Sequence, residues 1–85
     1  MIRVRCIGHI RTSVGAEEVN LDANEISASE LVERLRGMSK EADPGFNSFN
    51  TLAMIEDGEA FVPAAADRRI RSGERIVLIP FSHGG

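Results

Sequence analysis

The sequence predicts an α+β domain in which a mixed sheet of four to five strands packs on one main helix. Three features predict this class. Apolar and polar residues alternate over 2–7, an apolar stripe with helical spacing runs over 28–35, and a β-branched apolar run lies at 76–79. Strands on both sides of a single helix are typical of an α+β arrangement.

The composition limits both the size and the partners of the protein. A chain of 85 residues has room for one small core, so we expect one domain over 1–80 and a flexible tail over 81–85. A net charge of −3 argues against a nucleic-acid partner, which needs a basic surface. The sequence contains no apolar run of membrane-spanning length and no secretory signal, so we expect a cytoplasmic protein with no membrane partner.

The chain has few residues that could perform chemistry. Cys6 is the only cysteine, which excludes an internal disulfide and a four-cysteine metal site within one chain. We place Cys6 in the core as an inert apolar residue. His9 and His83 have no spacing that suggests a nucleophile, an acid–base pair or a metal site. We therefore predict no catalytic residue, no bound metal or cofactor, and no enzyme activity of its own.

The first two strands are predicted from period-two patterns. Ile2, Val4 and Cys6 face the core in the first strand, and 17–21 forms the second. The segment 8–16 between them is expected to be a connection. The two strands should pair antiparallel.

The helix has clear start and stop signals. Ser27 is the expected N-cap, and Glu30 completes a capping box three residues later. Gly37 is expected to end the helix. The apolar stripe that should face the sheet consists of Ala28, Leu31, Val32 and Leu35.

The second half of the chain is expected to contain a loop and two strands. Residues 39–50 are rich in turn formers, and Phe46 and Phe49 should pin this loop onto the core. A third strand is predicted over 52–56, followed by a tight turn and a short edge strand over 59–62.

The C-terminal stretch of the sequence is its most informative part. Pro80 should end the strand at 76–79, because it has no backbone N–H for a central ladder. The five residues from Phe81 reach about 17 Å when extended. Glycine fits where no side chain can, so Gly84 and Gly85 could carry a terminal carboxylate through a narrow channel. Two final glycines arise by chance in about 0.5% of chains. A frayed end or a remnant of purification remains an alternative.

Two segments carry a resemblance to a known family. The pattern Gly73-Glu74-x-Ile76-x-x-x-Pro80-x-x-x-Gly84-Gly85 resembles the ubiquitin-like sulfur carriers, namely the small subunit of molybdopterin synthase (MoaD) and the thiamine sulfur carrier (ThiS). Residues 1–15, with Arg11, are similar to the first strand and following turn of the molybdopterin-synthase subunit. The connection over 63–73 is longer than in the family pattern. The resemblance implies a ubiquitin-like β-grasp fold, with the last strand parallel to the first at the sheet centre.

The resemblance also implies a function as a sulfur carrier. In this family a ubiquitin-activating-type enzyme uses ATP and Mg to adenylate the terminal glycine, here Gly85, which is then converted to a thiocarboxylate. The large subunit of molybdopterin synthase, or another sulfur acceptor enzyme, would receive the sulfur. The tail that would insert into these partners consists of Phe81, Ser82, His83 and Gly84.

A docking surface next to the tail is also expected. If Ile76 and Leu78 face the core, then Val77, Ile79 and Phe81 could form an apolar patch for the partner. Scattered apolar residues on a sheet face are the simpler alternative. Arg11 matches an arginine of the family, although a structural ion pair would explain it equally well.

Two other functions remain open from the sequence. Gly85 could be joined to lysines of other proteins, as in a ubiquitin-like protein modifier. Alternatively, the chain could be a non-covalent interaction domain whose Gly-Gly end is incidental. The sequence does not name the final sulfur acceptor, which could be a pterin, a thiamine precursor or tRNA.

Overall fold

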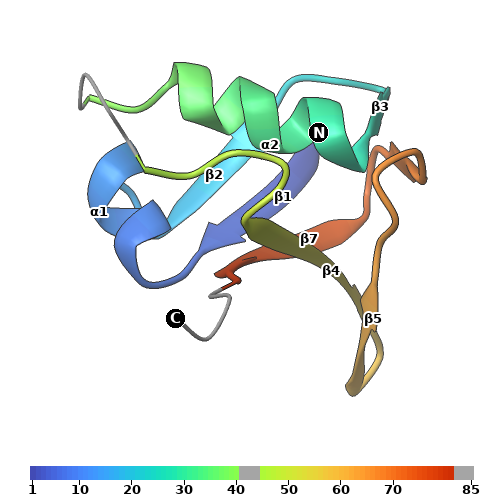
Figure 1. The fold of residues 1–85 in the computed structure, drawn as a ribbon. Helices are drawn as coiled ribbons and strands as arrows, with labels where there is room; N and C mark the ends of the chain where they lie inside the picture. The colour runs from blue at the N-terminus through green and yellow to red at the C-terminus, as the bar shows by residue number, and fades with distance from the viewer. Residues whose placement is uncertain (41–44, 82–85) are drawn as a thin grey trace.

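A computed structural model of the chain describes residues 1–40 and 45–81. In this part of the chain a five-stranded sheet of order β2-β1-β7-β4-β5 lies against helix α2 (Figure 1). Its strands are β1 (Ile2–Cys6), β2 (Glu18–Leu21), β4 (Thr51–Asp57), β5 (Ala60–Pro63) and β7 (Arg75–Pro80). The helices are α1 (His9–Val14) and α2 (Ala28–Gly37), and a separate two-stranded sheet pairs β3 (Glu25–Ser27) with β6 (Arg69–Arg71).

The last strand lies at the centre of the main sheet. β7 pairs in parallel with β1, with Cys6 opposite Leu78, and antiparallel with β4 on its other side. β1 and β2 pair antiparallel, as predicted. The parallel pairing of first and last strands, which the family resemblance implied, is confirmed.

The core lies between the sheet and α2. Leu78 and Val4 on the central strands are fully buried, and Cys6 is buried beside them. The predicted helical stripe of Ala28, Leu31, Val32 and Leu35 is buried against this face. The helical period therefore identified the face that α2 turns toward the sheet.

The N-cap of α2 is the one predicted. The Ser27 hydroxyl accepts a hydrogen bond from the Glu30 N–H at 3.2 Å. Replacing Ser27 with Ala should lower the free energy of unfolding by about 1 kcal/mol, because an N–H of the first turn loses its acceptor. Urea unfolding of Ser27→Ala and Ser27→Thr measures this, since threonine retains a capping oxygen. An equal loss in both variants would assign the effect to packing rather than to the cap.

The segment predicted as a connection over 8–16 instead contains a helix. α1 spans only His9–Val14, and Ile10 and Val14, four residues apart, are both buried. Gly15 ends the helix with φ +82°, and its N–H donates to the Arg11 carbonyl at 2.8 Å. A left-handed residue of this kind is a common helix C-terminus. The prediction failed because one helical turn shows too little period to detect.

The prediction for the two phenylalanines of the 39–50 loop is half wrong. Phe46 is 1% exposed and packs in the core, whereas Phe49 is 88% exposed. Phe49 lies in a turn whose backbone is bonded to side chains, its N–H donating to the Asn47 Oδ1 at 2.8 Å. This turn directs Phe49 outward, so of the two phenylalanines Phe46 is the one that packs the loop onto the core.

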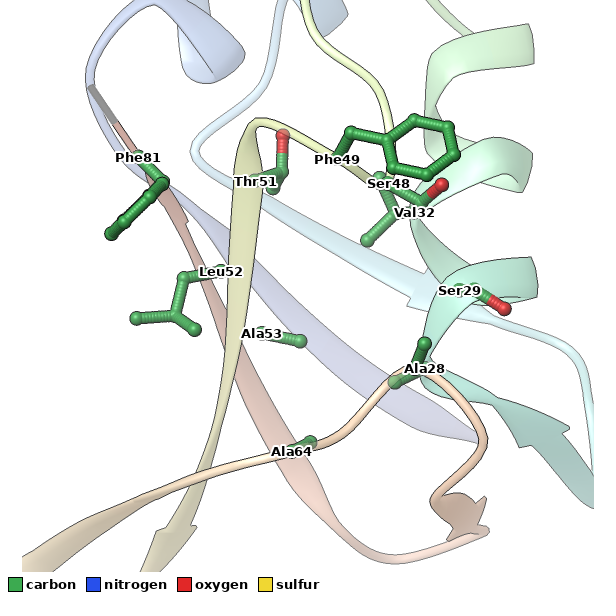
Figure 2. A pocket seen from close by; sticks show the side chains of 11 residues that line it. Ala28, Ser29, Val32, Ser48, Phe49, Thr51, Leu52, Ala53, Ala64 and Phe81 are labelled. Atoms are coloured by element: carbon green, nitrogen blue, oxygen red, sulfur yellow. The ribbon is translucent and has the colours of Figure 1, made fainter. Parts of the chain in front are cut away.

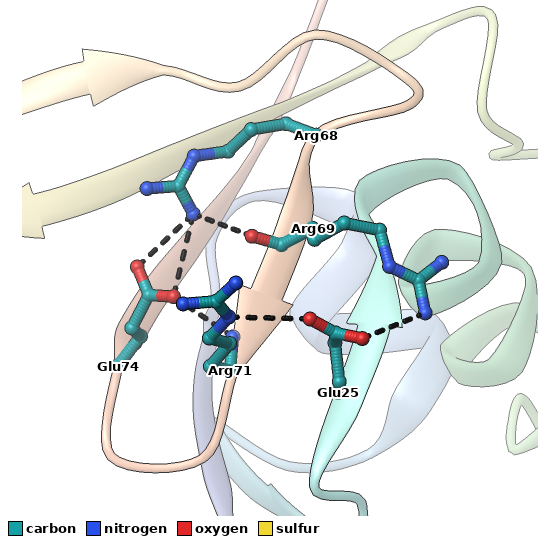
Figure 3. Close-up of polar contacts among 5 residues, drawn as sticks. All are labelled: Glu25, Arg68, Arg69, Arg71 and Glu74. Atoms are coloured by element: carbon teal, nitrogen blue, oxygen red, sulfur yellow. Dashed lines mark hydrogen bonds and ion pairs between the residues drawn. The ribbon is translucent and has the colours of Figure 1, made fainter.

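The small β3–β6 sheet was not predicted from the sequence. Figure 3 shows the ion pairs around it: Glu25 lies 3.3 Å from Arg69 and 3.2 Å from Arg71, and Arg68 lies 3.1 Å from Glu74. The hydrogen bonds that Glu25 accepts lower its pKa; the bond from Arg71 has the larger effect and the bond from Arg69 the second largest. Because these groups are exposed, their ion pairs add little stability. The buried Ile26 and Ile70, which face each other across the pair, are the stronger contact.

Candidate functional site

The C-terminal strand remains attached to the sheet up to Phe81. β7 ends at Pro80, and the Phe81 N–H donates to the Asn50 carbonyl at 2.8 Å. The remaining tail residues of the predicted site, Ser82, His83, Gly84 and Gly85, lie outside the described residues. Their insertion into a partner and the boundary between domain and tail stay predictions. Phe81 is therefore the root from which the predicted tail departs.

An apolar patch lies beside this root, on the face of the sheet turned away from α2. Ile79 pairs directly with Leu52, and Met54 occupies the next outward position of β4. These three side chains are half-buried, while Phe81 is 49% exposed. We call Leu52, Met54, Ile79 and Phe81 the root patch. It offers a partner an apolar surface where the tail begins.

Val77 differs from the other residues predicted for docking. It lies on the outward face, as expected from alternation with Leu78, but it is only 3% exposed. Its cross-strand neighbours are Arg5 on β1 and Met54 on β4. Directly opposite residues on neighbouring strands are close enough for a long side chain to cover a shorter one, and the apolar stem of an arginine can do this. Val77 therefore packs beside the root patch and presents almost no accessible surface to a partner.

A hollow of about 250 Å³ continues the root patch around the edge of β4. Figure 2 shows Phe81 and Leu52 on one side of this strand, and Val32, Ala28 and Ala64 on the side facing α2. The side chains that line it are apolar or hydroxylic, with none charged. The apolar surface near the tail root therefore extends from the outward face to the flank of the helix.

Cys6 occupies the core position predicted for it. It is 2% exposed, and burial raises the pKa of its thiol. Because the thiolate is the reactive form, Cys6 should react with a thiol reagent at pH 8 much more slowly than a free cysteine. Stopped-flow labelling in buffer and in 6 M urea, about the concentration needed to unfold a small domain, measures the difference. Equal rates in the two solutions would contradict the buried, inert assignment.

The other candidate groups are dispersed in the structure. His9 is exposed at the start of α1, and no three His, Cys, Asp or Glu residues within 1–40 and 45–81 lie close enough to hold a metal ion. Arg11 is exposed on α1 and has no ion-pair partner in the described part of the chain. No helix in the described ranges has the length and apolar character needed to span a membrane.

Comparisons with known proteins agree with this architecture. No family model matches the chain, and no curated protein matches it either. Among solved structures, the chain is similar to SAMP1 from Haloferax volcanii, with 16% identity, a TM-score of 0.69, and coverage of 99% of this chain and 98% of that one. The fold is a ubiquitin-like β-grasp. A second structure, of small archaeal modifier protein 1 from H. volcanii, is similar with 15% identity, a TM-score of 0.69, and coverage of 95% of this chain and 97% of that one.

The β-grasp sheet brings together residues that the sequence did not connect. Leu52 and Met54 were predicted within a strand but not assigned to a surface. Their signal was present, because Leu52 to Ile55 is apolar at every position and one half of such a run must face away from the core. Asn50 gave no comparable signal, since its carbonyl meets Phe81 only through the pairing of β4 with β7.

Proposed function

We propose that the chain is a ubiquitin-like carrier whose Gly85 carboxylate is activated by an adenylating enzyme of the ubiquitin-activating type. The observation that carries the proposal is the position of the tail root. The central strand of a β-grasp sheet ends beside an exposed apolar patch, and Gly84 and Gly85 follow four residues or fewer after Phe81. This arrangement supplies a docking surface at the point where the chain continues toward its slender reactive end.

The chemistry requires an activating partner. A carboxylate is a weak electrophile, because its negative charge is delocalised and repels nucleophiles. With ATP and Mg²⁺, a Gly85 oxygen would attack the α-phosphorus, pyrophosphate would leave, and an acyl-adenylate would form. A sulfur nucleophile that displaces AMP leads to a thiocarboxylate, and an amine leads to an amide. In this proposal the chain is a protein co-substrate, and the ATP and Mg²⁺ belong to its partner.

We favour sulfur transfer in molybdopterin synthesis as the fate of the activated end. The supporting observations are the N-terminal segment with Arg11 and the Gly73 to Gly85 pattern, both of which resemble the small subunit of molybdopterin synthase. The thiocarboxylate would enter the large subunit or another acceptor enzyme. Two terminal glycines suit such an entry, because they present only backbone to the channel walls.

Conjugation to proteins is the second candidate. It is favoured by the likeness to a structure described as a small archaeal modifier protein. In this function the Gly85 acyl group would be joined to the ε-amine of a lysine in a target protein. Both candidates use the same activation step, so they differ only in the nucleophile that follows.

The root patch would dock the activating enzyme in either case. Apolar residues that are clustered and accessible commonly mark protein interfaces. Ile79 and Phe81 are the accessible members predicted from the sequence, and Leu52 and Met54 extend the surface across β4.

Mass spectrometry of the C-terminal peptide from the native source tests the proposal. Trypsin cuts after Arg75, so the peptide should be Ile76 to Gly85. It contains no Met or Cys, which matters because oxidation of a methionine nearly equals a sulfur-for-oxygen exchange in mass. A thiocarboxylate on this peptide would identify a sulfur carrier. The same peptide attached to lysines of other proteins would identify a protein modifier. If the end is unmodified even when the activating enzyme and a sulfur source are supplied, both covalent functions are excluded. The remaining hypothesis is then a non-covalent interaction domain. The measured mass also tests whether the chain ends at Gly85.

A further inference from the structure

We propose that Gly8 and the turn from Asn47 to Asn50 form a clamp that fixes the direction in which the C-terminal segment leaves the sheet, and so positions Gly85 for activation. This inference rests on the function proposed above. The clamp residues lie in two segments distant in sequence, which meet at Pro80 and Phe81. They would act through the tail rather than touch the reacting atoms.

One side of the clamp is a backbone hydrogen bond. The Phe81 N–H donates to the Asn50 carbonyl at 2.8 Å. This bond extends the pairing of β4 and β7 one residue beyond the Thr51–Pro80 pair. Because successive residues of a strand direct their N–H groups to opposite sides, Phe81 is the next residue after Ile79 whose N–H can hold β7 to β4. The bond therefore fixes the chain at its last described residue.

The Asn50 carbonyl is held in place by reciprocal side-chain bonds. The Asn47 N–H donates to the Asn50 Oδ1 at 2.8 Å, and the Asn50 N–H donates to the Asn47 Oδ1 at 3.1 Å. The Asn50 Nδ2 also donates to the Gly45 carbonyl, and the Thr51 hydroxyl to the Asn50 Oδ1, both at 3.1 Å. Four bonds thus fix Asn50, which is more than an exposed turn needs merely to reverse the chain. Their effect is to aim one carbonyl at the tail root.

The other side of the clamp is a close contact with Gly8. A Cβ added to Gly8 would lie 3.0 Å from the Pro80 Cγ, closer than side chains normally approach. Gly8 also has φ +65°, which a residue with a side chain rarely adopts. The Ile7 N–H donates to the Leu78 carbonyl at 3.3 Å and keeps this segment against β7. The rigid ring of Pro80 is therefore seated directly on the backbone of Gly8.

The clamp would matter because it fixes where the flexible tail starts and in which direction it leaves the sheet. The four residues after Phe81 reach about 13 Å, so releasing Phe81 from Asn50 would lengthen the free segment and widen the volume that the terminal carboxylate samples. A root that sampled many directions would also reduce the fraction of molecules ready to insert, which raises the apparent KM by the same factor.

Adenylation of Asn50→Ala by the ubiquitin-activating-type enzyme of the source organism, followed as ATP–pyrophosphate exchange, tests the clamp. We expect the KM for this protein to rise about 5- to 10-fold with kcat within about twofold, because only insertion-ready molecules bind productively. Native-state hydrogen exchange should quicken at least about tenfold at the Phe81 amide and remain unchanged at Leu78, in the centre of β7. Each sample is first shown to be fully folded at the assay temperature.

Two variants control for a merely structural role. Asn24→Ala makes the same substitution far from the clamp, at an exposed side chain that makes no hydrogen bond within the described residues, so it should keep the wild-type KM. Asn50→Asp retains the oxygen that accepts from Asn47 and Thr51 but replaces the donor to Gly45 with a carboxylate oxygen, so its KM should lie between those of wild type and Asn50→Ala. Asn47→Ala, which removes the acceptor for the Asn50 amide, replaces Asn50→Ala if that variant does not fold.

The outcomes separate the clamp from the proposed function. If the wild-type protein is adenylated and Asn50→Ala matches Asn24→Ala in KM, the clamp is wrong while the proposed function stands. Unchanged exchange at Phe81 in Asn50→Ala would overturn the clamp as well. If the wild-type protein is not adenylated, the proposed function fails, and the clamp fails with it.

Discussion

Replacing Leu78 with Ala should lower the free energy of unfolding by about 3 kcal/mol. Leu78 is 0% exposed on the central strand, and its register neighbours are Cys6 on β1 and Ala53 on β4. Both neighbours are small, so they cannot expand to fill the space that a lost isobutyl group leaves. Large-to-small changes at such sites cost about 2–5 kcal/mol, because transfer and cavity terms add.

Urea unfolding followed by circular dichroism measures this loss. The matched control is Ile79→Ala, the adjacent position on the outward face, which is only half-buried and should cost about 1 kcal/mol. A small domain has only about 5–15 kcal/mol of stability in total, so the difference should be clear in the transition midpoint. Equal losses at the two positions would contradict the assignment of Leu78 to the core face and of Ile79 to the root patch.

The parts of the fold that were predictable are those that a local pattern encodes. The Ser27 cap and the helical stripe ending at Leu35 depend on spacings of three and four residues. β1 depends on period two, and Pro80, which has no N–H to donate toward β1, is the last residue of β7. In each case the physical cause acts within a few residues, so the sequence displays it directly.

The elements that escaped prediction are short or depend on distant partners. β3 and β6 have three residues each and are separated by more than 40 residues, so neither shows a period and nothing local links them. The exposed Phe49 required knowledge of the bonds made by Asn47. The burial of Val77 on the outward face required knowledge of Arg5 and Met54, which only the strand register supplies.

The residues of the candidate site also fall into those that a local pattern reveals and those that depend on distant partners. The tail residues and Ile79 were named from a terminal motif and from alternation, both of which can be read along the chain. Leu52 on β4 and Asn50 in the turn before it lie about 30 residues before the C-terminal segment that they contact. A surface assembled across two strands needs their register before its members can be named.

Removal of Gly85 should abolish activation of the chain and leave its stability unchanged. Gly85 lies four residues after Phe81, beyond the last strand of the sheet, so we expect unfolding midpoints that agree within about 1 °C. The shortened chain would end about 3.5 Å before the position that the carboxylate must reach. Because a misplacement of 1 Å can already cost about 100-fold, ATP–pyrophosphate exchange should fall at least 100-fold.

A second variant distinguishes the effect of tail length from the effect of lacking a side chain at the last position. Gly85→Ala keeps the terminal carboxylate at its full reach but adds a methyl group where the proposal requires a narrow channel. We expect an intermediate loss of about 10-fold for this variant, larger in kcat/KM than in any change of Tm. If Gly85→Ala were as active as wild type, the channel argument would be wrong while activation itself stood. If the chain without Gly85 were still activated, or if cells that carry it showed no defect, the reactive end would lie elsewhere and the chain would act as a non-covalent binding domain.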